Sequence, residues 1–322
     1  MLRLFHSIFG QDTEPPRYSE NLVRAAIERS VDGTDPWLRG LSGYHRKLRP
    51  AVLHAIDHVV SLVERLDAPL ELSRNNYSVD PLLRLCFISA DQLDNLLCTD
   101  PALSDCNQAS PPFWALLAME CEQRRTFGVD QQGDLMVRDV PQVTVGMTNH
   151  RLLDPMTALG ETQRFLKRRA FDHLLSLALA RIVATQDARE NLLRHRTLLQ
   201  SKLNCLQRGN WGFSDLSREA PLPVVELHEN LDEIEAKLLE LGGDDRYIEK
   251  NLEILVEVLG SAERQLWGEQ LSLIVDRMGI KRSVAADDAP EIRLTELHNA
   301  AGRRMIIRLV KIPQAVHVSK DF

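Results

Sequence analysis

The pattern of apolar residues changes along the stretch from Arg164 to Arg208, which predicts one very long helix or two helices in line. Its first half is apolar nearly all round at about 100° per residue, which is typical of a helix buried on more than one side. Residues 184–191 are nearly all polar. We therefore expect the first half to lie in the body of the protein. The second half then projects, or the helix breaks at 184–191.

Leucines farther along the chain predict an antiparallel helical hairpin. Spacings of four and three residues, typical of a coiled-coil seam, occur in two segments separated by a Gly- and Pro-containing loop. These positions are Leu199, Leu203, Leu206, then Leu227, Leu231, Ile234, Leu238 and Leu241. A third helix is predicted at about 245–259. Residues 164–208 carry ten Lys/Arg and three Asp/Glu, and residues 222–269 carry four and thirteen. This opposite charge favours pairing of the consecutive helices.

The N-terminal third predicts short helices whose starts are marked by Asp-Pro or Ser-Pro, because an Asp or Ser N-cap followed by proline suits a first helical turn. Asp-Pro occurs at 35–36, 80–81, 100–101 and 154–155, and Ser-Pro at 110–111. The helices are predicted at about 20–31, 36–47, 50–66, 81–86, 90–97, 101–105 and 111–124.

Alternating apolar and polar residues predict strands in two later regions. Residues 125–148 are expected to form a three-strand meander, with Pro141 at an edge or a turn. Runs near 271–275, 292–297 and 305–312 predict further strands. Because isolated hairpins are marginal in water, we expect 125–148 and 270–312 to share one small mixed or antiparallel sheet.

The predicted fold class is α+β and predominantly α-helical, a helical body with the long hairpin and the small sheet. The expected divisions of the chain are an N-terminal segment and linker, a helical region, a meander with the first half of the long helix, a helical arm, and a C-terminal β region. They span residues 1–20, 21–124, 125–183, 184–260 and 261–322.

Composition indicates a globular protein, with 44% hydrophobic and 26% charged residues among 322. The net charge of −7 does not favour nucleic acid as the main partner. Five cysteines without a CxxC pair indicate free thiols in a reducing compartment, and no secretory signal or membrane span is predicted. A cytoplasmic location is therefore expected. Residues 1–9 are apolar enough for weak docking on a membrane surface, although packing or disorder is favoured over docking.

Candidate chemistry is sparse. His54 and His58 have the i, i+4 spacing of zinc-binding histidines, but Ala55 stands where metalloproteases carry a glutamate base, so this is only a weak metal candidate. His173, which follows Asp172, is interpreted as a hydrogen-bonded core histidine in preference to a catalytic base. The chain contains no Gly-x-Ser-x-Gly, no phosphate-binding loop and no Gly-x-Gly-x-x-Gly. No catalytic residue and no cofactor are predicted.

The basic residues of the long helix scatter around its axis, whereas a nucleic-acid footprint needs them on one face. The loop that ends this helix is a better candidate, because exposed aromatics often anchor protein interfaces. We therefore predict a partner-binding tip at Asn210, Trp211 and Phe213, the alternative being that both aromatics plug the hairpin end.

The sequence identifies no particular activity. The favoured hypothesis is a non-enzymatic protein–protein interaction, scaffold or assembly protein that binds a protein partner or self-associates as a homo-oligomer. The alternatives are an enzyme whose site is assembled near the sheet and a peripheral membrane-surface protein docked by residues 1–9.

Overall fold

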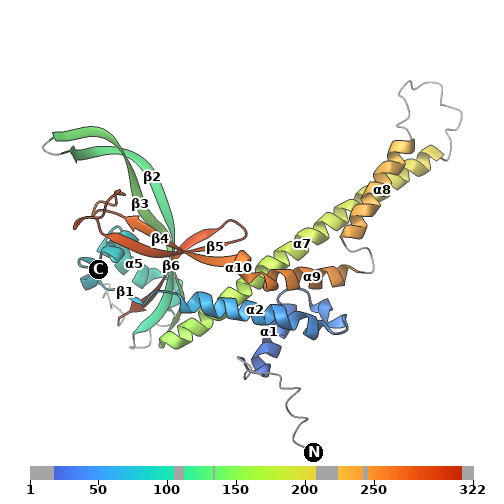
Figure 1. Ribbon diagram of the computed structural model, residues 1–322, viewed down its shortest axis with the longest axis horizontal. Coiled ribbons are helices and arrows are strands. Elements are labelled where there is room, and N and C mark those ends of the chain that lie inside the picture. The colour runs from blue at the N-terminus through green and yellow to red at the C-terminus, as the bar shows by residue number, and fades with distance from the viewer. Residues whose placement is uncertain (1–17, 105–111, 133–134, 208–223, 242–245, 314–322) are drawn as a thin grey trace, which may run out of the picture. The chain divides into compact units, whose positions relative to one another are not determined.

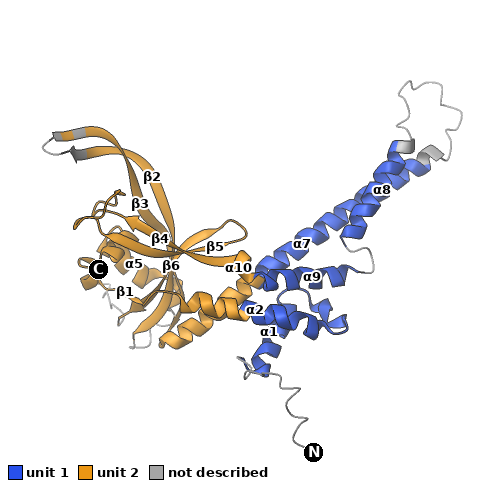
Figure 2. Ribbon diagram, viewed as in Figure 1, with its two compact units in different colours: residues 1–55, 175–261 blue, residues 56–174, 262–322 orange. Residues whose placement is uncertain are grey.

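The computed structural model describes residues 18–104, 112–132, 135–207, 224–241 and 246–313. The chain forms two compact units, coloured separately in Figure 2. Unit 1 comprises residues 1–55 and 175–261, and unit 2 comprises residues 56–174 and 262–322. The fold is α+β and predominantly helical, as predicted, and its strands form one six-stranded sheet (Figure 1).

Unit 1 is helical. Its elements are α1 (Glu20–Asp32), the 3-10 helix η1 (Pro36–Gly40), the first half of α2 (Tyr44–Glu64), the second part of α7 (Leu159–Gln207), α8 (Val224–Glu240) and α9 (Tyr247–Gly260). The predicted Asp-Pro cap is confirmed at Asp35, whose Oδ1 accepts a hydrogen bond from the Trp37 N–H at 2.9 Å. The other carboxylate oxygen of Asp35 accepts from the Asn251 side chain of α9 at 2.8 Å. This buried contact joins η1 to α9.

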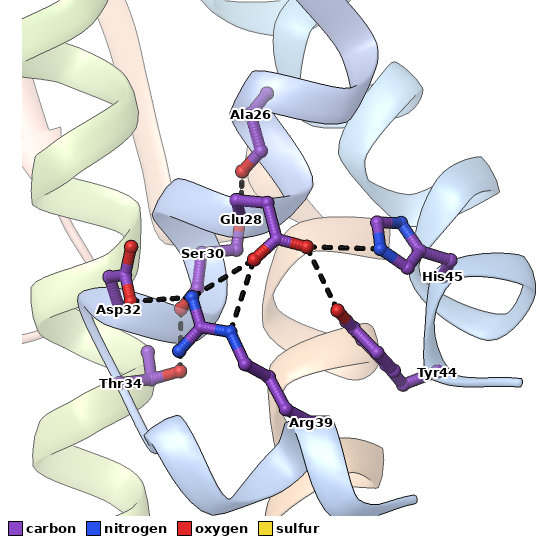
Figure 3. A network of polar contacts seen from close by, with 8 residues as sticks. All are labelled: Ala26, Glu28, Ser30, Asp32, Thr34, Arg39, Tyr44 and His45. Atoms are coloured by element: carbon purple, nitrogen blue, oxygen red, sulfur yellow. Dashed lines mark hydrogen bonds and ion pairs between the residues drawn. The ribbon is translucent and has the colours of Figure 1, made fainter. Parts of the chain in front are cut away.

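A polar network around Glu28 joins α1, η1 and the start of α2 (Figure 3). The Glu28 carboxylate accepts hydrogen bonds from Arg39 at 2.9 and 3.1 Å and from the Tyr44 hydroxyl at 2.8 Å, and lies 2.9 Å from His45 Nε2. Arg39 also reaches Asp32 at 2.6 Å. The Tyr44 and Arg39 bonds lower the pKa of Glu28. Arg39, Tyr44 and His45 lie in other elements than Glu28, so we interpret the network as one that holds these elements together.

The helical hairpin is confirmed. The second half of α7 packs against α8 through a seam of buried residues, which are Leu199, Leu203, Leu227, Leu231, Ile234 and Leu238. Leu192 and Leu193 are partly buried and pack beside this seam. The helix is continuous through residues 184–191, so the alternative of a break there is wrong. The first half of α7 buries Leu166, Phe171, Leu174, Leu175, Ala178 and Ile182, and it leaves Phe165, Leu179 and Val183 partly exposed.

Unit 2 contains the sheet, with strand order β3-β2-β6-β5-β4. The strands are β1 (Leu70–Glu71), β2 (Phe113–Gln132), β3 (Leu135–Met156), β4 (Leu266–Ile274), β5 (Glu291–Asn299) and β6 (Arg304–Ile312). Neighbouring strands are antiparallel, except that β1 pairs with β6 in parallel. Short helices complete the unit: α3 (Arg74–Tyr77), α4 (Pro81–Cys86), α5 (Ala90–Thr99), α6 (Pro101–Ser104) and α10 (Ala262–Gln265).

The two faces of the sheet bury different residues. On one face, an inner core packs strand residues against α4 and α5: Leu117, Met119, Val145, Leu273, Leu294, Ile306, Leu83 and Leu93. On the other face, an outer core packs strand residues against α2 and α7: Leu116, Ala118, Ile307, Leu309, Val63 and Leu166. The connection after β4 hydrogen-bonds to β3, through Val145 N–H to Gly279 O and Lys281 N–H to Val143 O, both at 2.8 Å. The sheet therefore curls around the inner core, with its two outer strands bridged.

Three sequence predictions that concern the sheet are wrong. Residues 113–124 lie in β2 and are not helical. They had no visible alternation because β2 is central and faces a core on both sides, so its residues are apolar in succession. The expected three-strand meander is two long strands, and the run at Val143 and Val145 is part of β3. Asp154-Pro155 does not start a helix. Asp154 sits within β3 with φ 50°, and α7 begins at Leu159.

Most other elements agree with their predictions. The strands β4, β5 and β6 contain the three predicted C-terminal runs, and Val143 and Val145 lie beside 279–281, so the two β regions share one sheet as expected. Pro141 lies in β3, at the edge of the sheet. Residues 36–47 form η1 and, after Gly43 with φ 74°, the start of α2, so they are not one helix. Among the helices of the described ranges, none has the length and hydrophobicity needed to cross a bilayer.

Candidate functional site

Unit 2 contains a cavity of about 350 Å³ between α2, α7 and the sheet. Its wall is mainly apolar and comes from five of the strands and two helices. The apolar lining residues are Leu62, Val63, Leu66, Leu116, Leu153, Leu166, Ala170, Leu266, Leu297, Met305 and Ile307. Arg169, His173, His298, Asn299 and Arg303 add polar groups. The cavity therefore combines the outer core with a polar end.

The polar end is organised by Asn299, the last residue of β5. Asn299 is buried, and its Oδ1 accepts a hydrogen bond from the Arg303 N–H at 2.9 Å across the β5–β6 turn. Its Nδ2 lies 3.0 Å from Nε2 of His173 on α7. Since Oδ1 is already an acceptor, Nδ2 donates, and Nε2 of His173 must accept. His173 is therefore held as a neutral imidazole.

Burial lowers the pKa of His173, and the nearby Arg303 guanidinium lowers it further because two positive charges repel. The interpretation of His173 as a hydrogen-bonded histidine is thus confirmed. Its Nε2 is occupied by Asn299, so this nitrogen is not free to take a proton from a bound molecule.

Two of the remaining polar residues have partners of their own. Arg169 forms two bonds with Asp154, at 2.7 and 2.8 Å, which raise the pKa of the arginine and compensate its charge. His298 stacks on the Trp267 ring with 5.5 Å between centroids, and its Nε2 lies 3.1 Å from Glu296. Arg303 differs, since its side chain is exposed to solvent and forms no ion pair with a described carboxylate. The polar end thus carries one positive charge that is not paired within the described residues.

The polar groups of the cavity are few. Among the described residues that line it there is no serine, cysteine, lysine, aspartate or glutamate. The lining supplies an apolar wall, the guanidinium groups of Arg169 and Arg303, and the imidazoles of His173 and His298.

The sequence-predicted site residues do not converge on this cavity. Asn210, Trp211 and Phe213 lie outside the described residues. His54 and His58 lie on α2, and His58 Nε2 is 2.6 Å from the Leu266 carbonyl oxygen. Within the described ranges, no group of three or more histidine, cysteine or acidic residues is arranged to hold a metal ion.

A second candidate surface is formed by the outer ends of β2 and β3. Strand β6 pairs with β2 only as far as Met119, and the bridges to 279–281 reach β3 only at residues 143–145. Beyond them, residues 126–132 of β2 pair only with residues 135–142 of β3 among the described strands. We call this two-stranded segment the outer ribbon; in Figure 1 it extends past the other strands of unit 2.

The outer ribbon exposes three large apolar side chains. Phe127 is 77% exposed, Val129 49% and Met136 70%. Met136 pairs with Gln131 on the neighbouring strand, and a register shift between Gly128 and Asp130 makes the outer ribbon irregular at Val129. The sequence predicted strands in this region but did not show that these apolar side chains are exposed.

The fold and these sites define an α+β protein with a mainly apolar cavity and an exposed β-ribbon. Comparisons of the chain with protein-family models, with curated proteins and with solved structures find no match.

Proposed function

We propose that this chain is a non-enzymatic protein–protein interaction or assembly protein, and that the outer ribbon is a surface that binds its partner. The observation that carries the proposal is the exposure of Phe127, Val129 and Met136 on a ribbon whose outer edges pair with no other described strand. Open strand edges present unpaired N–H and C=O groups to a neighbouring chain, and natural proteins normally blunt them. Proteins that bind by strand addition use such edges.

Energetics supports a partner at this ribbon. A two-stranded hairpin is marginal in water, and no third strand of the described ranges pairs with the outer ribbon. Complete burial of a large apolar side chain contributes about 1.5–3 kcal/mol. Phe127 and Met136 together could therefore supply much of the energy of a micromolar complex, which needs about 8 kcal/mol.

The predicted tip residues Asn210, Trp211 and Phe213 remain a second proposed contact with a protein partner or with another copy of the chain. A cytoplasmic location also remains a proposal. It is supported by Cys86, Cys98 and Cys121, which are free thiols.

The test uses the full chain with Phe127→Ser and Met136→Ser combined. A photocrosslinker placed at position 129 identifies the bound protein in cells, and the purified pair is then titrated by calorimetry. We expect the double variant to weaken that complex at least tenfold, because two apolar anchors are lost. If the chain crosslinks to itself, light scattering against concentration replaces the titration.

The matched control is Val79→Ser with Val284→Ser, which removes two apolar side chains of similar exposure elsewhere in unit 2. It should leave the affinity unchanged. Equal affinity of the outer-ribbon variant and the control, with circular dichroism unchanged, contradicts the proposal.

A further inference from the structure

The cavity of unit 2 is independent of the outer ribbon and has the size of a ligand site. Its volume of about 350 Å³ lies at the lower end of the range for small-molecule pockets, about 300–1,000 Å³. The cavity is also partly open to solvent, because Arg303 and Met305 of its lining are exposed, so a ligand can enter it.

The apolar lining indicates which chemical group the main part of a ligand would carry. Eleven of the sixteen lining residues are apolar, so water in the cavity finds few hydrogen-bond partners. An aliphatic chain has no hydrogen bonds to lose in such a space, and burial of its methylenes contributes favourable free energy to binding. Since a water-sized group takes about 30 Å³, the space accommodates on the order of ten groups of that size.

The polar end determines the headgroup. Arg169 is neutralised by Asp154, and His173 is a neutral imidazole bonded to Asn299. Arg303 remains as a solvent-exposed positive charge without a carboxylate partner among the described residues. A guanidinium presents paired donors that match a carboxylate. One such charge at the end of an apolar space favours a single negative charge on the ligand.

We propose that the cavity binds a medium-chain fatty acid, with its alkyl chain between α2, α7 and the sheet and its carboxylate at Arg303. The chain lies against Ala170 of α7 and Met305 of β6. Asn299 positions the carboxylate end by holding the β5–β6 turn that carries Arg303.

The first experiment titrates the full-length protein with hexanoate, octanoate, decanoate, dodecanoate and tetradecanoate, each below its micelle concentration. Each buried methylene should strengthen binding about fourfold, because about 0.8 kcal/mol per methylene corresponds to that factor. The gain should stop at about ten carbons, when the cavity is full. Decyltrimethylammonium, which has a C10 chain and the opposite charge, should bind at least tenfold more weakly than decanoate.

The second experiment blocks the cavity from two sides. Ala170→Trp and Met305→Trp fill it from the helix and from the sheet, and each should weaken decanoate binding at least tenfold. Arg164→Trp places the same bulk on an exposed position of α7 that does not line the cavity, and it should have no effect. Circular dichroism selects the variants that fold.

The third experiment tests the headgroup. Arg303→Gln should remove most of the preference for decanoate over decyltrimethylammonium, whereas Arg293→Gln, an exposed arginine of β5, should keep it. Absence of saturable decanoate binding by the unmodified protein overturns the proposal. So does binding that keeps strengthening from decanoate to tetradecanoate, ignores headgroup charge, or is unaffected by a folded cavity-filling variant. If neither tryptophan variant folds, the chain-length and charge series decide.

Discussion

The hydrogen bond between Asn251 and Asp35 offers the sharpest test of what stabilises unit 1. Asn251 is 2% exposed and Asp35 is 8% exposed, so neither side chain can turn to bulk water. One oxygen of Asp35 caps η1 through the Trp37 N–H, and the other accepts from Asn251 at 2.8 Å. A single carboxylate thus satisfies two donors from different parts of the chain.

Two substitutions separate these roles. Asn251→Leu leaves a buried carboxylate oxygen without its donor, which should cost about 1–3 kcal/mol. Asp35→Ala removes the cap, worth about 1 kcal/mol, and also strands the buried Asn251 amide, so it should cost about 2–4 kcal/mol. The double variant should be less destabilised than the sum of the two by about 1–3 kcal/mol, because their losses share one bond.

The assay is urea unfolding followed by circular dichroism, with hydrogen exchange of peptides from η1 and α9 reporting on unit 1 separately. The control is Asp80→Ala, since Asp80 caps α4 in the same way through the Leu82 N–H at 2.8 Å. It should cost only the cap, about 1 kcal/mol. If Asn251→Leu changes the free energy of unfolding by less than about 0.5 kcal/mol, the argument that this buried bond matters is wrong.

Three further predictions concern single groups. Because the pKa of His173 is lowered in the folded protein, the unfolded chain binds a proton on this residue more readily. The free energy of unfolding should therefore fall as the pH drops below the pKa of the unfolded histidine, about 6.5. The variant His173→Gln should reduce this pH dependence in urea titrations. Burial raises the pKa of Cys86 to about 12, so iodoacetamide should label exposed Cys98 rapidly and Cys86 only on unfolding, as peptide mass spectrometry will show. The double variant Trp211→Ala with Phe213→Ala should abolish binding of a purified partner while circular dichroism stays unchanged. Retained binding would show that these two aromatics are not a contact with that partner.

The sequence predicted those elements whose signals are local. Asp35, Asp80 and Asp100 cap helical segments because an aspartate followed by proline acts within one turn, and each accepts the expected backbone N–H. The leucine seam between α7 and α8 was also predictable, since its period depends only on neighbouring turns.

Other features depend on distant parts of the chain. Residues 113–119 contain alanine, leucine and methionine, which favour helix, yet they form the centre of the sheet because β3 and β6 flank them. Asp154 looked like a helix cap, but in β3 it pairs with Arg169. The cavity was not predictable for the same reason. Its lining comes from seven elements, and no spacing in the sequence brings His173 and Asn299 together.

The order in which the sheet is completed has a consequence for synthesis of the protein. Strand β2 pairs with β6 from Phe113↔Ile312 to Met119↔Ile306, and these partners lie far apart in the chain. At ribosomal rates of about 5–20 residues per second, β2 waits roughly 10–40 s for β6 to be made. During that interval the nascent chain exposes an apolar strand edge that the finished protein covers. Expression at reduced temperature or with extra chaperone should therefore raise the soluble yield, and a chain truncated before β4 should be captured by chaperones and degraded.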